Sequence, residues 1–505
     1  MPGGLMQISA YGAQDFYLTG NPQISFFKSV YRRYTNFAME NYRVNPEGNL
    51  GLTDNDITSY KFEIKRNGDL ISDIYMVFSL PDIYSDNGTD FRWIKNIGFN
   101  IINKVSVYIG GSLIDENYGE WFDIWNELTL PENKKKEFNE MIGNIPELYD
   151  PANAPGFNYY PNSPINGTIP SIRGRKIRVP LIFWFNRNYS LAIPLVALQY
   201  MPLEIVLEMR NITDLYTVVD INKNNETYGC RIKPLKTVPD YNKFYSLINF
   251  VNDNSFDLVA GEGNNRNLKN FNVDVYLDVN YIFLDTEEMK TFAKSEHKYL
   301  IQQVKQSSFK GSIGSDTLEL LVHHPTSYMV VVAKRSDAED RNDWNNYTNW
   351  ILEDIPPWSD GFQNEFFERY YDDNESTEYV NDTNFSFRKT PFILDNLKLK
   401  LNGTDRFAEQ DADYFNRVIP FKHADKIPKK GIMMYNFGVN PLDYQPSGSC
   451  NFSRFNSIEL FLETVNSPRP VSLGDYVYKF DVNVYTINYN ILRIANGTGN
   501  VEFSN

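Results

Sequence analysis

Apolar and polar residues alternate with a period of two along many short stretches of the chain. Examples are YKFEIKR, LEIVLEM, NLKLKLNG and FDVNVYTINYNIL. This period places apolar side chains on one face of a strand, as in a sheet with one buried face. Gly110-Gly111 and Asn402-Gly403 stand between such stretches, where tight hairpin turns need positive φ angles. Helical periodicity is scarce, with its best example at residues 287–304, so the pattern predicts an all-β protein with a few short helices.

The two halves of the chain contain similar pieces in the same order. Val105–Leu128 and Leu397–Phe421 each read as a strand, a tight turn and an acidic segment that opens an aromatic helical turn. Two further pairs of segments match in the same way: residues 60–80 with 317–334, and residues 202–209 with 457–464. The shared order predicts that one β domain occurs twice.

A polar segment at residues 215–240, poor in strand pattern, separates the two halves. We therefore expect an N-terminal arm at residues 1–25, a first domain at 26–225 and a second at 226–505. Each half exceeds 200 residues, whereas eight strands of about six residues need only about 50. Long loop insertions between the strands account for the difference.

One such insertion, residues 336–384, is strongly acidic. It contains 14 Asp and Glu residues against two arginines, a net charge of −12. It also contains Trp344, Trp350 and Trp358, so it is more than a polar tail. We expect an ordered loop that projects from the second domain into water, with these tryptophans in it. A disordered acidic linker is the alternative.

Composition narrows the class of protein. The formal net charge of −15 argues against nucleic acid as a direct partner, because a phosphate backbone attracts clustered Lys and Arg. The chain has two cysteines, Cys230 and Cys450. We therefore expect no disulfide framework, and we expect both thiols to be free, as in a reducing compartment. We find no signal sequence and no run approaching the roughly 20 apolar residues of a membrane span.

No motif in the sequence indicates catalysis, a metal or a cofactor. The four histidines show no zinc-ligand spacing, and neither cysteine has a CxxC partner. A group of carboxylates could suggest a metal or glycosidase site, but acidic residues before YFNRV also suit the first turn of a short helix. These carboxylates are Asp405, Glu409, Asp411 and Asp413. We therefore expect a protein that is not an enzyme.

A basic, aromatic segment near the N-terminus, SFFKSVYRRYTNF, contrasts with the acidic chain. It could be a nucleic-acid arm, a membrane-surface helix or a segment that docks onto a larger assembly. The residues that we expect to carry its function are Lys28, Tyr31, Arg32, Arg33 and Tyr34.

Several stretches resemble the major capsid proteins of nucleocytoplasmic large DNA viruses, in the mimivirus-related and algal-virus branch. The likeness rests on GGLMQISAYGAQDFYLTGNPQISFFKSVYRRYTNFAMEN, IPLVALQYMPLEIVLE, YIFLDTEEMKTFAKSEHKYLIQQV, LNGTDRFAEQDADYFNRVIPFKH, YQPSGSCNFSRFNSIEL and VYTINYNILRIANGTG. These segments run from the first residues almost to the last.

The resemblance implies a double jelly roll, two eight-stranded antiparallel β-sandwiches in one chain. It also implies homotrimers that form pseudo-hexagonal capsomers and tile an icosahedral virion, assembled in the host cytoplasm. The N-terminal arm would lie at the capsomer base. Arg32 and Arg33 would face minor capsid proteins or the inner membrane surface, or else pair with carboxylates inside the trimer.

Two other functions stay open at this point. A carbohydrate-binding or carbohydrate-cleaving β-sandwich protein could use exposed Trp and Tyr for stacking on sugars, and it would be a monomer with a groove. A minor capsid component is the other alternative, although such a role generally suits a single jelly roll.

Overall fold

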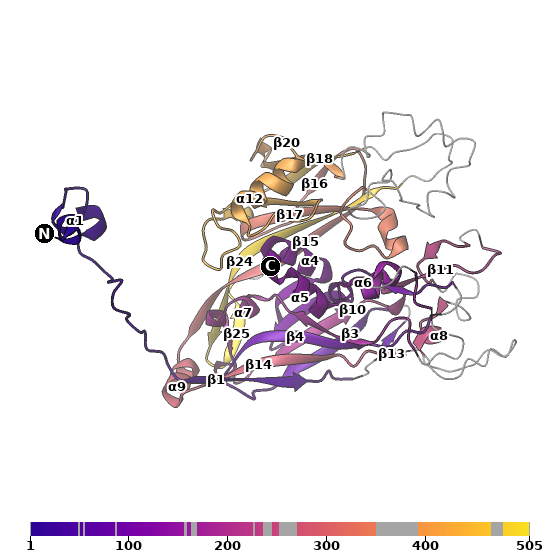
Figure 1. Ribbon diagram of the computed structural model, residues 1–505, viewed down its shortest axis with the longest axis horizontal. Helices are drawn as coiled ribbons and strands as arrows, with labels where there is room; N and C mark the ends of the chain where they lie inside the picture. Colours follow the sequence, from indigo (N-terminus) through magenta and orange to yellow (C-terminus); the bar gives the residue numbers. More distant parts are fainter. Residues whose placement is uncertain are drawn as a thin grey trace.

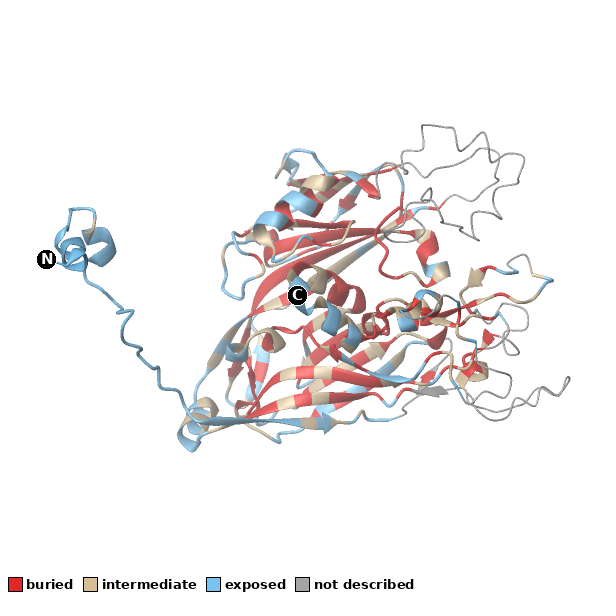
Figure 2. Ribbon diagram, in the orientation of Figure 1, coloured by how far each residue is buried: buried red, intermediate tan, exposed pale blue. Residues whose placement is uncertain are grey.

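The computed structural model describes residues 2–48, 51–53, 56–85, 88–155, 159–162, 169–225, 228–235, 245–251, 270–349, 392–465 and 478–503. Two β-sandwiches lie side by side in the main body, and an N-terminal arm extends away from it (Figure 1). The strands carry most of the buried residues, and the arm is exposed (Figure 2).

The first sandwich consists of two four-stranded antiparallel sheets. One has the order β1 (Phe37–Val44), β14 (Tyr276–Leu284), β4 (Leu70–Leu80) and β8 (Arg175–Pro180). The other has the order β3 (Thr58–Ile64), β10 (Leu203–Met209), β6 (Ile102–Ile109) and β7 (Ser112–Tyr118). The short strand β9 (Ile193–Pro194) pairs with β4. One small sheet has the order β12 (Arg231–Ile232), β11 (Tyr216–Val219) and β5 (Arg92–Trp93). A second one consists of β2 (Gly51–Thr53) and β13 (Asn270–Asn272).

The second sandwich repeats this plan. One sheet has the order β15 (His297–Ser312), β24 (Phe480–Ala495), β17 (Pro325–Arg335) and β21 (Ile432–Asn436), extended by β22 (Cys450–Asn451) and β25 (Thr498–Val501). The other has the order β16 (Ser315–Glu319), β23 (Ile458–Thr464), β18 (Leu394–Leu401) and β19 (Thr404–Asp405), with β20 (Gln410–Asp411) on β18. In both sandwiches the equivalent strands are therefore neighbours in the same order, which confirms the repeat and the double jelly roll.

Short helices occupy the connections. Those of the arm and the first jelly roll are α1 (Gly3–Ser9), α2 (Phe16–Thr19), α3 (Ile97–Asn100), α4 (Gly119–Thr129), α5 (Glu132–Ile142), α6 (Pro146–Tyr149), α7 (Trp184–Arg187) and α8 (Ile248–Val251). Helix α9 (Thr286–Lys294) links the jelly rolls, and a π-helical turn, η8 (Tyr414–Val418), runs into α12 (Ile419–His423) in the second. The 3-10 turns are η1 (Pro151–Asn153), η2 (Tyr189–Leu191), η3 (Leu195–Ala197), η4 (Ile212–Asp214), η6 (Ser336–Arg341) and η9 (Phe452–Arg454).

The strand pairing corrects the boundary that we expected between residues 225 and 226. Strand β14 (Tyr276–Leu284) lies between β1 and β4 of the first jelly roll, and Tyr281 pairs with Glu40 of β1. The second jelly roll therefore begins after α9, with β15 at His297. The described parts of the polar segment at 215–240 contain β11 and β12, which belong with β5 to the first jelly roll. Polarity did not mark the boundary, because loops within a jelly roll can be as polar as linkers between domains.

The arm is also longer than expected. The first strand begins at Phe37, and residues 2–36 contain only the two short helices α1 and α2. The arm thus extends to Asn36 rather than to residue 25.

Two hydrophobic cores support the chain. The larger one fills the first jelly roll and continues across the contact between the rolls to Tyr328, Val330 and Tyr485 of the second. The smaller one lies between the sheets of the second jelly roll and includes Met329, Val331 and Val484. Strands β17 and β24 are consequently buried on both faces. The nearly continuous apolar run of β17 fits this burial, whereas β24 alternates apolar residues with buried polar residues such as Asn483 and Asn488.

Candidate assembly surfaces

Helix α4 lies between the two jelly rolls and forms the centre of their contact (Figure 1). At its first residue, Gly119, the chain passes very close to the backbone of α3 and of the start of β6. A Cβ at Gly119 would overlap the carbonyl oxygen of Ile102 and lie 2.5 Å from that of Phe99. Phe122 then fills the first core, while Trp121 stacks near Tyr485 of the second jelly roll, with ring centroids 5.3 Å apart.

A buried carboxylate, Glu120, connects α4 to the sheet of the second jelly roll. Its oxygens lie 2.9 Å from Lys334 Nζ, and they accept hydrogen bonds from the Tyr485 hydroxyl and Asn483 Nδ2, both at 2.6 Å. Burial alone would raise the pKa of Glu120, but Lys334 and these hydrogen bonds outweigh it and lower the pKa. The charge is thus retained in a site shielded from water.

Further ion pairs surround this centre. Asp123 Oδ2 lies 2.9 Å from Lys429 Nζ, and Glu127 Oε2 lies 3.3 Å from Lys426 Nζ. These pairs link the same helix, α4, to the segment that follows α12. The two jelly rolls are therefore held in one fixed arrangement by both apolar and charged contacts.

Asp115 of β7 is a buried carboxyl group in the same contact. Its Oδ1 accepts hydrogen bonds from the backbone N–H of Glu116 at 2.9 Å and of Val304 in β15 at 3.4 Å. Burial raises its pKa to about 8, although the charge of Arg187 acts in the opposite direction. Gln303 of β15 also donates to the carbonyl oxygen of Ile114. Asp115 and its neighbour Ile114 therefore belong to the contact between the rolls.

The start of the acidic insertion also belongs to this contact, which corrects the outward position expected for Trp344. Its side chain is 8% exposed, its Nε1 donates to the carbonyl oxygen of Asp214 at 3.0 Å, and the Arg210 guanidinium lies 3.9 Å from its ring centroid. An Arg that stacks on an indole removes it from water. Trp350 and Trp358 lie outside the described residues.

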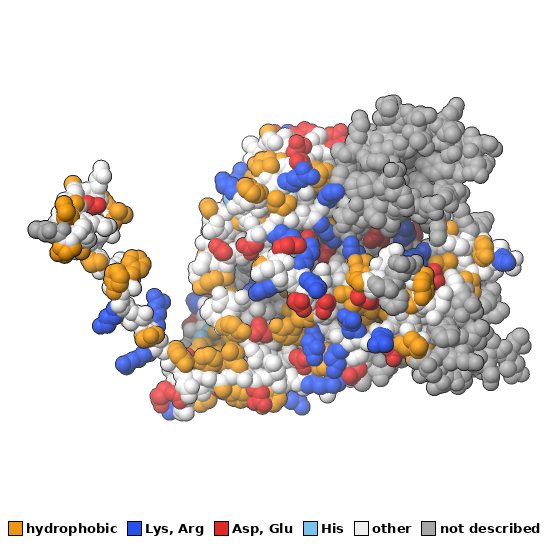
Figure 3. Space-filling model, in the orientation of Figure 1, with side chains coloured by type: hydrophobic (Ala, Val, Ile, Leu, Met, Phe, Trp, Pro, Cys, Tyr) orange, Lys and Arg blue, Asp and Glu red, His pale blue; other side chains and the backbone are white. Residues whose placement is uncertain are grey.

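The candidate docking residues of the arm are all exposed. Phe27 and Tyr31 are 99% and 90% exposed, and Tyr34 touches Phe37 edge to face at a centroid distance of 6.3 Å. Within residues 2–48, the ion pair that the structure contains is Arg43–Asp274, and Lys28, Arg32 and Arg33 take part in none. Figure 3 shows hydrophobic and basic side chains together along the arm.

The sequence suggested that the carboxylates before YFNRV belong to a helix start, and the structure agrees for Asp411. Its Oδ1 accepts a hydrogen bond from Tyr414 N at 2.9 Å. Asp405 pairs with Lys398 at 2.8 Å, and Asp413 pairs with Arg417 at 3.1 Å. In the part of the chain that the structure describes, no group of three or more His, Cys, Asp and Glu residues could hold a metal.

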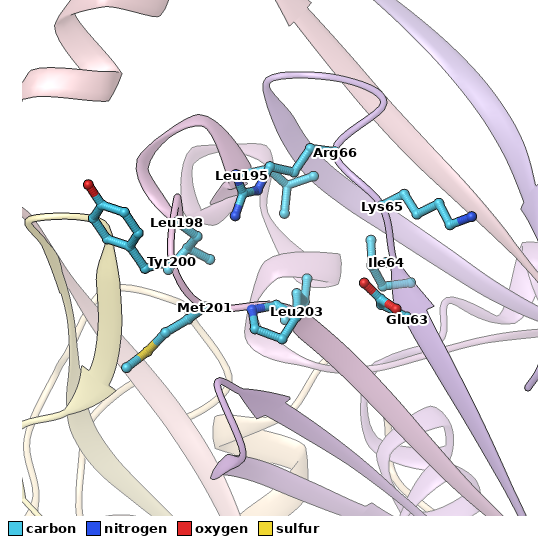
Figure 4. A pocket seen from close by; sticks show the side chains of 10 residues that line it. Glu63, Ile64, Lys65, Arg66, Leu195, Leu198, Tyr200, Met201 and Leu203 are labelled. Carbon is cyan, nitrogen blue, oxygen red and sulfur yellow. The ribbon is translucent and has the colours of Figure 1, made fainter.

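A pocket of about 530 Å³ opens at the end of β3 and the beginning of β10 (Figure 4). Leu195, Leu198 and Leu203 form its apolar wall, and Lys65 and Arg66 reach its rim. Tyr200 borders it and bonds through its backbone N–H to the carbonyl oxygen of Gly497 at 3.0 Å. The lining offers aliphatic contact and positive charge but no pair of facing carboxylates.

Two family models match nearly the whole chain. The model described as "Major capsid protein N-terminus" matches residues 25–285, and "Large eukaryotic DNA virus major capsid protein" matches residues 288–500. The chain belongs to the major capsid proteins of large eukaryotic DNA viruses. This capsid protein is 32% identical to the major capsid protein of Phaeocystis pouchetii virus and 30% identical to that of Paramecium bursaria Chlorella virus 1, each over the full length of both chains.

Solved structures agree with this assignment. The capsid protein superposes on the chain in "PBCV-1 virus capsid, quasi-atomic model" with a TM-score of 0.63 and 26% identity, covering 95% of this chain and 100% of that one. The Faustovirus major capsid protein gives a TM-score of 0.63 at 14% identity, covering 97% and 96% of the two chains, and shows the shared fold. The protein is therefore a structural component of a virion capsid and not an enzyme.

The capsid protein contains functional contacts that sequence reasoning missed. Glu120, Lys334 and Tyr485 form the centre of the inter-roll contact, yet none was singled out. The available signal was the run SYMVVVA, since a short continuous apolar stretch is consistent with a strand buried on both faces.

Among the described helices, none is long and apolar enough to span a membrane.

Proposed function

We propose that three copies of the capsid protein associate into a pseudo-hexagonal capsomer, and that many capsomers tile the outer shell of a large icosahedral virion. The observation that carries this proposal is the repeat of one strand order in two sandwiches of a single chain. Three such chains supply six similar jelly rolls, which suit a six-sided building block. Rigid sandwiches with fixed mutual contacts also suit a shell made of many equal parts.

The partners are then neighbouring copies, neighbouring capsomers and components on the inner side of the shell. The exposed arm with Arg32 and Arg33 is suited to bind minor capsid proteins or the anionic inner membrane surface. Direct contact with nucleic acid does not fit the net charge of −15. Synthesis and assembly take place in the host cytoplasm.

The mass of the native protein tests the proposal. Light scattering or native mass spectrometry should give about three times the 58.7 kDa of the chain, and the value should persist on dilution. A monomer at protein concentrations far above the dissociation constant of a typical stable complex would overturn the trimer. The same preparation should show no binding of glycans, which a carbohydrate-binding sandwich would require.

A further inference from the structure

The repeated strands can be aligned residue by residue from their pairing. Val330 of β17 lies opposite Tyr485 of β24, and Val77 of β4 lies opposite Tyr276 of β14. The sequences around the two valines, Tyr-Met-Val in both cases, agree with this register. Tyr276 therefore occupies the position in the first jelly roll that Tyr485 occupies in the second.

The helical segments after the second strand pair align in the same way. Glu120-Trp121-Phe122 in α4 corresponds to Asp413-Tyr414-Phe415 at η8. Phe122 and Phe415 both fill the core of their own jelly roll, with 0% and 2% exposure. Asp413 thus occupies the position of Glu120.

The two copies of this surface differ in what they touch. In the first jelly roll Glu120 meets Lys334 and Tyr485 of the second. In the second jelly roll the corresponding Asp413 is 48% exposed and pairs with its own neighbour Arg417. Apolar side chains beside it are exposed as well, among them Val418 at 53% and Phe421 at 79%. Figure 3 shows hydrophobic and charged side chains mixed on the surface around α12.

The face that would receive this surface is the outer face of the sheet with β14 and β4. Tyr276 lies there, only 5% exposed, with the Arg43 guanidinium 3.8 Å and Lys176 Nζ 5.7 Å from its ring centroid, so Arg43 is the group that a second copy can reach. Arg43 is 47% exposed and pairs with Asp274 at 2.9 Å. The first jelly roll thus offers a cation and a tyrosine on this face, as Lys334 and Tyr485 of the second jelly roll both contact the Glu120 carboxylate.

We propose that the surface formed by η8 and α12 docks on the outer face of β14 and β4 of a second copy, where Asp413 pairs with Arg43 beside Tyr276. The contact repeats the arrangement of Glu120, Lys334 and Tyr485 between copies instead of within one. Arg417, released from Asp413, then faces Asp274, which Arg43 has left. The contact also removes the exposed side chains of Val418 and Phe421 from water.

Such a contact joins two different surfaces of the chain, so each copy has one of each to offer. Contacts of this kind close into a ring when the rotation between copies allows it. The inference rests on the proposed trimer and specifies which surfaces hold it together.

Charge reversal tests the pairing. Asp413→Arg and Arg43→Asp should each lower the apparent affinity between copies at least tenfold in sedimentation or native mass measurements, and the double variant Asp413→Arg/Arg43→Asp should recover most of the loss. Glu287→Arg is the matched control, because Glu287 is also exposed and pairs with a neighbour on its own helix, Lys290, at 3.2 Å. It should leave the association unchanged.

A crosslink gives an answer even if a charge variant folds poorly. The double variant Asp413→Cys/Arg43→Cys should form disulfide-linked multimers under oxidation, and neither single variant should. A wild-type monomer would overturn the trimer itself. A wild-type trimer that tolerates Asp413→Arg and forms no crosslink would keep the trimer and overturn this interface.

Discussion

Glu120 Oε1 of the first jelly roll lies 2.9 Å from Lys334 Nζ of the second, and the carboxylate is only 8% exposed. Removing one partner of a shielded ion pair leaves the other charge without compensation. The pair therefore fixes the relative position of the two jelly rolls within the single chain, before any second copy binds.

Glu120→Gln should lower the free energy of unfolding by about 3 kcal/mol, because it leaves the Lys334 ammonium and its shielded surroundings without a carboxylate. Urea unfolding monitored by tryptophan fluorescence measures the change. Glu287→Gln, at a side chain that is 84% exposed, should change the value by less than about 0.5 kcal/mol. Equal effects of the two substitutions would contradict the role of Glu120.

Asp115 should make stability depend on pH. In the unfolded chain its pKa has the ordinary value near 4, whereas burial raises the folded-state pKa to about 8. Between these values the folded protein binds the extra proton, so the free energy of unfolding falls as the pH rises, by up to about 1.4 kcal/mol per pH unit.

Asp115→Asn removes this titration and keeps an oxygen that can accept from the backbone N–H groups. Urea unfolding at several pH values from 5 to 8 should therefore show a smaller decline with rising pH in the variant than in the wild type. Parallel curves for both proteins would exclude Asp115 as the source of the dependence.

Gly119 should not tolerate a side chain. A Cβ would overlap the carbonyl oxygen of Ile102 and press on that of Phe99, so Gly119→Ala must displace α4 from β6. We expect a loss of about 1–3 kcal/mol in the free energy of unfolding, as for other overpacked sites. Gly111→Ala is a useful comparison, because a Cβ there meets no atom within 4 Å, although its φ of +83° adds strain. If Gly119→Ala costs less than Gly111→Ala, close packing at Gly119 is not the reason for the glycine.

The sequence was sufficient for the fold class because both of its signals can be read directly from the order of the residues. The alternation of YKFEIKR and LEIVLEM specifies strands β3 and β10, and the matching segments of the two halves specify the repeat. The boundary between the rolls could not be found in this way. Strand β14 is close in sequence to the second roll, but its hydrogen bonds go to β1 and β4, and only the tertiary structure determines that choice.

The candidate site was harder to predict because contacts across the rolls are not periodic. Trp344 lies in an acidic stretch, and the composition of that stretch predicted a loop exposed to water. The Trp344 side chain is instead buried, in contact with the Arg210 guanidinium and the carbonyl oxygen of Asp214. Glu120 was not singled out at all, because its partners Lys334 and Tyr485 in the second jelly roll lie more than 200 residues away in sequence.

The arm should serve assembly beyond the trimer. Its aromatic side chains are exposed, and within the described chain Arg32 and Arg33 form no ion pair. Deletion of residues 1–24, or Arg32→Glu together with Arg33→Glu, should therefore leave the mass of the trimer unchanged. Both changes should reduce the yield of closed shells, counted by electron microscopy. The deletion removes the exposed aromatic side chains of Tyr11, Phe16 and Tyr17 from the arm, and the double substitution reverses the charge of its basic residues.

Lys134→Glu together with Lys136→Glu is the matched control for the arm variants, since it reverses two exposed positive charges on α5 of the first jelly roll. It should leave shell yield unaltered. Loss of the trimer in the arm variants would instead show that the arm packs within the capsomer, with its arginines next to carboxylates of a neighbouring copy. The two outcomes separate a segment that fastens capsomers to the inner side of the shell from one that holds the capsomer itself together.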